Sequence, residues 1–181
     1  MSPKSKLAQL DLAALRIIHY PDPRLAQPAA PIEACDEAVA RLADRMFELM
    51  IASRGVGLAA PQVGLSLRIF VARPTASDAD RRVYVNPRLL SLEGRMDEEE
   101  GCLSVPGVTC RLRRHQAATI EAKDLRGEVF RQTGEGLLAR IFQHETDHLD
   151  GRLIIDRMGS LARMAHRRAL KDLRDRFAEN R

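Results

Sequence analysis

Residues 143–151 read Q-H-E-T-D-H-L-D-G and contain the pattern H-E-x-x-H. Because residues four apart lie one above the other on one face of a helix, His144 and His148 can bind one metal ion. Glu145 projects beside them, where its carboxylate can accept a proton from water that a metal activates. The pattern therefore predicts a hydrolytic metal site. The alternative is a surface helix in which two histidines and a glutamate stand together by chance.

The residues around this pattern favour a helix that faces the interior. Apolar residues recur upstream at helical spacing, at Leu137, Leu138, Ile141 and Phe142. Leu137 and Ile141 share one stripe with the two histidines, so we expect the metal-binding face to point inward. Gly151 follows the last periodic residue, which is typical of a helix end.

A catalytic metal site usually has three protein ligands and leaves a further position for water, so a third ligand is needed. Cys102 is the candidate, because Gly101 lets the chain turn just before it. Cys110 is the rival ligand, but it lies among arginines and lacks a preceding glycine. Cys35 precedes the first predicted helix, and we expect it to be structural. The sequence thus predicts a Cys-His₂ site with room for water.

Three motifs together resemble those of the peptide deformylase family. They are G-V-G-L-A-A-P-Q at 55–62, E-G-C-L-S at 100–104 and Q-H-E-T-D-H-L-D-G at 143–151. The resemblance covers about residues 17–156. Peptide deformylases remove the N-formyl group from the initiator methionine of newly made bacterial proteins. The resemblance therefore implies N-formylmethionyl nascent peptides as substrates.

The resemblance also implies roles for individual residues. Cys102, His144 and His148 would bind the metal, and Glu145 would be the acid and base. Gln62 and the backbone N–H of Leu103 would stabilise the oxyanion. The residues implied in substrate binding are Val56, Gly57, Leu137 and Ile141, with the Gly57 backbone holding the peptide like an extra strand.

The identity of the metal does not follow from the ligands alone. A tetrahedral Cys-His₂ site suits zinc by general ligand preference. The family resemblance instead implies Fe²⁺, one ion per chain, with Zn²⁺, Ni²⁺ or Co²⁺ able to take its place.

Two positions depart from the family pattern. Thr146 stands where the family usually has a larger aliphatic residue, and we expect it to point away from the ligands. Thr109 stands where many members have a substrate-binding arginine, and Arg111 is the candidate to compensate.

The rest of the chain predicts the elements that position these residues. A 3.6-residue rhythm predicts a helix from near Asp36 to before Gly55. Residues 67–72 and 82–85 are β-type runs, and residues 119–133 predict a hairpin. Gly159-Ser160 begins a terminal helix whose apolar stripe would be Leu161, Met164, Ala165, Leu173 and Phe177. This order predicts an α+β fold with antiparallel sheets around the metal-binding helix and a C-terminal helix.

The length of 181 residues fits one catalytic domain, in which we expect residues 1–14 to form a loose leader. A hydrophobic share of 45% and a charged share of 30% are typical of a soluble globular protein. We find no secretory signal and no apolar run near the roughly 18 residues that span a bilayer. Three cysteines argue against a disulfide framework. We expect a cytoplasmic monomer that does not bind membranes.

Residues 160–181 form a basic segment with seven basic and three acidic side chains, a net charge equal to the +4 of the whole chain. Such a face is either solvated surface or a surface that contacts RNA. The resemblance suggests docking on the ribosome, as for some bacterial members of the family.

Two other classes of function compete with the deformylase interpretation. H-E-x-x-H is shared with many zinc endopeptidases, but the third histidine of the metzincin pattern is absent after His148. A non-catalytic metal-binding or ribosome-associated protein would have little use for Glu145, which is not a ligand in this pattern.

Overall fold

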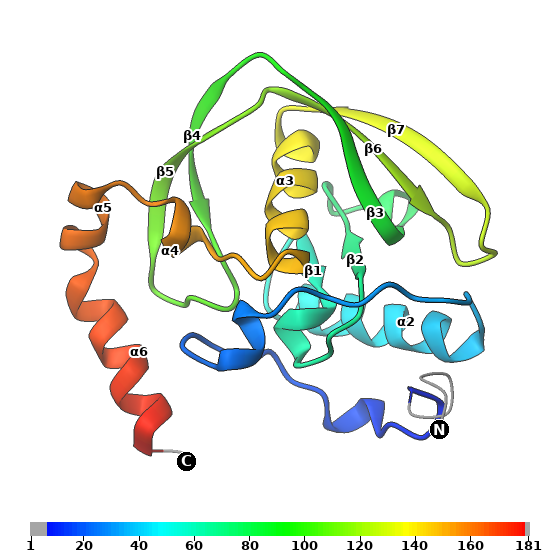
Figure 1. Cartoon of the computed structure of the whole chain (residues 1–181), viewed down its shortest axis with the longest axis horizontal. Helices are drawn as coiled ribbons and strands as arrows, with labels where there is room; N and C mark the ends of the chain where they lie inside the picture. The colour runs from blue at the N-terminus through cyan, green and yellow to red at the C-terminus, as the bar shows by residue number, and fades with distance from the viewer. Residues whose placement is uncertain (1–6, 180–181) are drawn as a thin grey trace.

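The computed structural model describes residues 7–179 and contains two antiparallel β-sheets within them. The larger sheet has the strand order β1-β2-β3-β6-β7 and the smaller one pairs β4 with β5. The strands are β1 (Gly57–Ala59), β2 (Ile69–Ala72), β3 (Arg82–Glu93), β4 (Met96–Gly101), β5 (Thr109–Arg114), β6 (Ala117–Lys123) and β7 (Val129–Glu135). β3 is longer than the predicted run at 82–85 and leads directly into β4 of the second sheet (Figure 1).

Helix α3 (Leu137–Leu149) lies between the β4–β5 pair and the larger sheet (Figure 1). It contacts all five strands of the larger sheet. Its residue Phe142 packs edge-on against Tyr84, with ring centroids 5.3 Å apart, and Tyr84 stacks on Phe70 at 4.5 Å. This aromatic cluster anchors the helix that carries the H-E-x-x-H pattern. The predicted α+β fold is confirmed.

Helix α2 (Glu37–Ala52) covers the larger sheet near β1 and β2. The Asp36 side chain accepts hydrogen bonds from the N–H groups of Ala38 and Val39, both 3.1 Å long, and so caps the helix at its predicted start. Fully buried Leu42 and Met46 confirm the predicted 3.6-residue rhythm.

Residues 7–14 of the expected leader contact the rest of the domain, and residues 1–6 lie outside the described part. Leu7 and Leu12 pack against the apolar cluster around α2. The guanidinium of Arg45 donates to the backbone carbonyls of Leu12 and Leu15 at 3.1 Å each. These contacts bind the segment to α2.

The predicted hairpin is confirmed as β6 and β7, whose turn is closed by Asp124. Its carboxylate accepts from the backbone N–H groups of Arg126 and Glu128 at 2.8 and 2.9 Å. An Asp side chain that accepts hydrogen bonds from backbone N–H groups in this way stabilises the turn that it begins.

The predicted terminal helix is divided into two helices, α5 (Ser160–Ala165) and α6 (Arg167–Glu179), and a short helix, α4 (Ile154–Arg157), precedes its predicted start. Because the helix breaks at His166, the apolar residues of α5 do not continue the buried face of α6. Leu161 and Met164 of the predicted stripe are 79% and 63% exposed, which corrects that prediction. Leu173 of the predicted stripe is buried, as is Leu170, and both pack in one cluster with β5.

None of the helices within residues 7–179 is both long enough and apolar enough to cross a membrane.

Candidate active site

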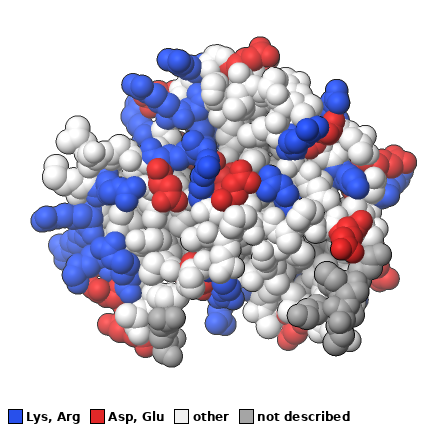
Figure 2. Space-filling view, in the orientation of Figure 1, with Lys and Arg blue, Asp and Glu red and all other residues white. Residues whose placement is uncertain are grey.

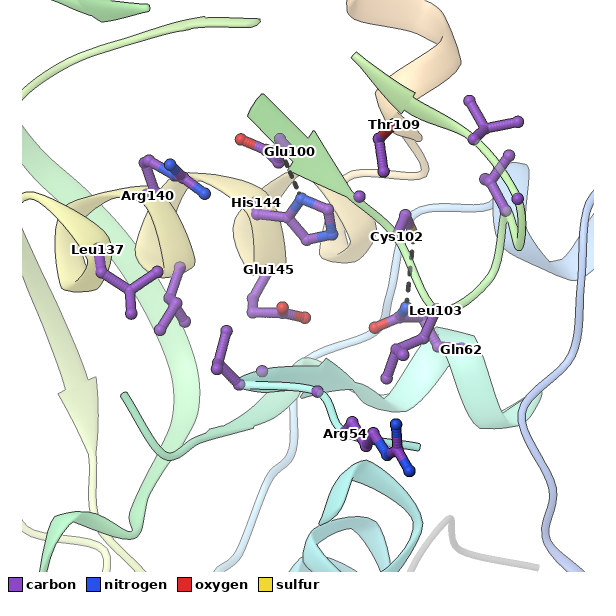
Figure 3. A pocket seen from close by; sticks show the side chains of 18 residues that line it. Arg54, Gln62, Glu100, Cys102, Leu103, Thr109, Leu137, Arg140, His144 and Glu145 are labelled. Carbon is purple, nitrogen blue, oxygen red and sulfur yellow. Dashed lines mark hydrogen bonds and ion pairs between the residues drawn. The ribbon is translucent and has the colours of Figure 1, made fainter. Parts of the chain in front are cut away.

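The structure brings together the three side chains that the sequence predicts as metal ligands. His144 and His148 come from α3, and Cys102 comes from the turn after β4. Figure 3 shows His144 and Cys102. Cys102 Sγ lies 3.3 Å from His148 Nε2, which lies 3.1 Å from His144 Nε2. All three donor atoms lie within 4.8 Å of one another.

This donor set fits a divalent transition-metal ion. Metal bonds of about 2.0–2.3 Å to nitrogen and sulfur place tetrahedral ligands roughly 3.3–3.8 Å apart, close to the spacing of these atoms. Burial lowers the pKa of His148 well below its usual value, which favours the neutral imidazole whose lone pair can bind metal.

The other two cysteines do not reach the metal donor set. Cys110, the rival ligand, is buried in the cluster of β5, α4 and α6. Cys35 packs against the α2 cluster, as expected for a structural residue.

Glu145 lies beside the donors in a buried position, 3% exposed. Burial raises the pKa of its carboxyl to about 7, and the negative charge of the nearby Glu100 adds to this. Its Oε2 atom has no hydrogen-bond partner among the described residues. A carboxyl in this state can accept and return a proton near neutral pH.

Gln62 presents its amide N–H group toward the metal donors. Its Oε1 accepts from the Ala59 N–H at 2.9 Å, so Nε2 points the other way and lies 3.7 Å from Cys102 Sγ (Figure 3). Ser104 Oγ accepts a second bond from Nε2 at 3.3 Å. The short helix at Ala60–Val63 thus holds the amide in one orientation.

A cavity of about 380 Å³ opens in front of these groups. Gln62, Cys102, Leu103, His144 and Glu145 line it, as do the four residues predicted to bind substrate: Val56, Gly57, Leu137 and Ile141. Val56 and Leu137 are 40% and 41% exposed, so apolar surface is available at the cavity mouth.

β1 is an edge strand of the larger sheet and borders this cavity. The Arg73 N–H donates to the Val56 carbonyl at 2.8 Å. Because backbone groups alternate in direction along an antiparallel strand, the N–H and C=O of Gly57 point to the free edge. An extended peptide can add to that edge as a further strand.

The two departures from the family pattern have different outcomes. Thr109 lines the cavity, but Arg111 does not; its guanidinium donates to the Asp97 carbonyl at 2.8 Å. The expected compensation by Arg111 is therefore not supported. The arginines that do line the cavity are Arg54 and Arg140, which sequence reasoning missed. Thr146 is buried and is absent from the cavity lining, as expected.

Sequence reasoning also missed Glu100, although it stands in the quoted E-G-C-L-S motif. Its carboxylate accepts a 2.6 Å hydrogen bond from His144 Nδ1 (Figure 3). Burial raises the pKa of this carboxyl, but the hydrogen bonds from His144 and Arg114 outweigh burial and lower it to about 2. Arg114 alternates with Leu112 and Cys110 on the inward face of β5, a period-two pattern that marks a buried arginine.

Comparisons with known proteins point to one family. The family model described as polypeptide deformylase matches residues 14–164 of this chain. A peptide deformylase of Acidobacterium capsulatum is 46% identical over 149 residues, 81% of this chain and 88% of that protein. A peptide deformylase of Pseudomonas aeruginosa is 44% identical over 161 residues, 88% of this chain and 96% of that protein.

Solved structures agree with the sequence comparisons. The crystal structure of a peptide deformylase from Legionella pneumophila has a TM-score of 0.84 and 44% identity, covering 91% of this chain and 98% of that one. The crystal structure of Arabidopsis thaliana peptide deformylase 1B with an inhibitor has a TM-score of 0.88 and 38% identity, covering 92% and 93%. The similarity thus spans the segments that form the cavity.

Proposed function

The chain belongs to the polypeptide deformylase family, whose members remove the N-formyl group from N-terminal formylmethionine, and we propose how its residues perform that reaction. The observation that carries the proposal is the convergence of three metal donors, a buried carboxyl and an oriented amide on one cavity. Together these groups suit hydrolysis of a formyl amide to formate and a free amine. We propose that the described residues form a single catalytic domain.

Cys102, His144 and His148 hold one metal ion, which we propose to be Fe²⁺ because of the family resemblance. Zn²⁺, Ni²⁺ or Co²⁺ can use the same donors. When bound, the ion would supply Lewis acidity, which would lower the pKa of water in the site.

Glu145 is the acid and base of the reaction. Its carboxylate accepts a proton from the attacking water and later delivers a proton to the leaving amine. The low exposure and raised pKa of this carboxyl support both steps.

Gln62 and Leu103 stabilise the oxyanion. The formyl carbon becomes tetrahedral and its oxygen gains negative charge. The Gln62 Nε2–H group and the Leu103 backbone N–H donate to that oxygen. The bond from Ala59 to Gln62 Oε1 supports this role, since it keeps the donor end of the amide toward the cavity.

The substrate lies along β1 with its methionine side chain in the apolar part of the cavity. The backbone groups of Gly57 pair with the peptide as with a neighbouring strand. Val56, Leu137 and Ile141 contact the methionine side chain. The exposed apolar surface of Val56 and Leu137 supports this placement.

We also propose a cytoplasmic monomer that meets nascent chains at the ribosome through its basic C-terminal helices. Figure 2 shows Lys and Arg side chains gathered over the side of the molecule formed by α5 and α6. Arg167 and Arg168 at the start of α6 are exposed. A positive face of this kind favours contact with RNA phosphates.

Formate release tests the proposed function. Anaerobically purified protein should release formate from a formyl-Met-Ala-Ser peptide. The same peptide without its formyl group should give no product. A control peptide that offers only internal peptide bonds should not be cleaved either. Cleavage of the internal peptide would instead support a zinc endopeptidase, and no turnover despite a bound metal would support a non-catalytic metal-binding protein.

A further inference from the structure

A buried chain of charged side chains ends on His144. Arg114, 3% exposed, donates from Nη2 to Glu100 Oε1 at 2.6 Å and from Nε to Oε2 at 3.1 Å. Its Nη1 donates to Asp147 Oδ2 at 2.6 Å. Arg157 of α4, which is partly exposed, donates to the same Asp147 carboxylate from the solvent side. The chain thus joins β4, β5, α3 and α4 behind the metal donors.

These charges are costly to bury, and apolar residues of the same volume often stabilise a core as well or better. The geometry offers a reason for their presence. Glu100 uses one oxygen to accept from His144 Nδ1, and the arginine fork occupies both of its oxygens. The arginine is always charged, so it holds the carboxylate as a hydrogen-bond acceptor. His144 must then carry its proton on Nδ1, which leaves the Nε2 lone pair facing the other two ligands.

The two histidine ligands differ in this respect. His148 Nδ1 is buried and has no hydrogen-bond partner among the described residues. The orientation of His148 therefore depends on packing, whereas that of His144 depends on Glu100 and on the group that holds Glu100.

We propose that Arg114 is a positioning residue for the metal, which acts through Glu100 to fix the tautomer and orientation of His144. Asp147 accepts from the third nitrogen of the guanidinium, Arg157 holds Asp147 in place, and both thereby keep the fork on Glu100. This inference rests on the metal site of the proposed function. It assigns part of the affinity for a divalent transition-metal ion to a residue that touches neither metal nor substrate.

Cobalt binding tests the proposal without reference to catalysis. The affinity of metal-free protein for Co²⁺ is measured by visible absorption in competition with a chelator. Arg114→Lys keeps the charge but loses the fork, and it should weaken Co²⁺ binding by about 10–100-fold, as should Glu100→Gln. Because Arg114 acts through Glu100, adding Arg114→Lys to Glu100→Gln should cause no further loss. Arg131→Lys, in an exposed arginine pair with Glu121, is the matched control and should bind Co²⁺ as wild type does.

Two results would overturn the proposal: wild-type affinity in Arg114→Lys, or a full additional loss in the double variant. If the buried substitution Arg114→Lys prevents folding, Arg157→Gln replaces it, since the Arg157 side chain is 40% exposed. We then expect a smaller loss of Co²⁺ affinity and a shifted His144 Nδ1–H proton signal in Zn²⁺-loaded protein; no change in either refutes the role. Wild-type protein that fails to bind Co²⁺ would contradict the metal site itself, and this inference with it.

Discussion

The amide of Gln62 illustrates how one hydrogen bond can decide a chemical role. The Ala59 N–H donates to Oε1 and so turns Nε2 toward the proposed oxyanion position. A carboxylate at this position would bring negative charge to the same place, and an apolar side chain would bring no donor.

We therefore predict that Gln62→Ala lowers kcat by about 10²–10³ and that Gln62→Glu lowers it further. The measurement is formate release at saturating formyl-peptide, with metal content determined on the same samples. A kcat within twofold of wild type in Gln62→Ala would remove this amide from the oxyanion site.

The central residues were predictable because their signals are local. The spacing of His144 and His148 needs only helical geometry, and Cys102 follows a glycine within its own motif. Glu100 and Arg114 were not assigned because their partnership joins residues 14 positions apart in sequence, on paired strands. Inward alternation along β5 would have marked Arg114 as buried, but not its partner. Arg111 was misassigned because the sequence does not show that its guanidinium donates to the Asp97 carbonyl on the neighbouring strand.

β1 and α3 approach each other so closely that a side chain at Gly57 has no room. An added Cβ would lie 2.9 Å from Cδ of Glu145 and closer still to one of its oxygens. The strand proposed to bind the peptide and the helix that carries the proposed base are thus fixed against each other at this glycine.

Gly57→Ala should accordingly reduce kcat/KM for formyl-peptide at least tenfold, because it displaces the Glu145 carboxylate or the strand edge. Overpacking of this kind costs about 1–3 kcal/mol, so thermal unfolding is measured alongside. Gly159→Ala is the control, since a Cβ there meets no heavy atom within 4 Å. Equal kinetics in the two variants would contradict the close approach.

The elements themselves were partly predictable. The rhythm of α2 and the β6–β7 hairpin are visible in sequence because each has a clear period and a recognisable cap or turn. The far half of β3 was missed because most of its side chains at 88–93 lie outside the core, so no apolar alternation marks it. The break at His166 was missed because the residues on both sides favour helix equally well.

The basic helix α6 packs on the same apolar cluster as Val105 and Val108, which line the cavity. Leu170 and Leu173 of α6 belong to the apolar cluster with β5 and α4. Deletion of residues 160–181 would therefore expose a core and would not isolate a docking role. Charge reversal on the exposed side of α6 is the better test.

The double substitution Arg167→Glu and Arg168→Glu should weaken cosedimentation with ribosomes, most strongly at low salt, because RNA contacts are electrostatic. It should leave kcat/KM on a short formyl-peptide unchanged. Arg95→Glu with Arg126→Glu makes the same change in net charge at exposed positions elsewhere. Equal weakening by both pairs would show a general charge effect, and no weakening would end the docking proposal.

The most direct test of the proposed catalytic centre is formate release by Glu145→Gln protein that holds one metal ion per chain. The amide keeps the volume of the side chain but cannot accept the proton from water. We predict retained metal and a loss of turnover of about 10²–10⁴. Turnover within a few-fold of wild type in metal-loaded Glu145→Gln would contradict the assignment of the base and with it the proposed use of this site.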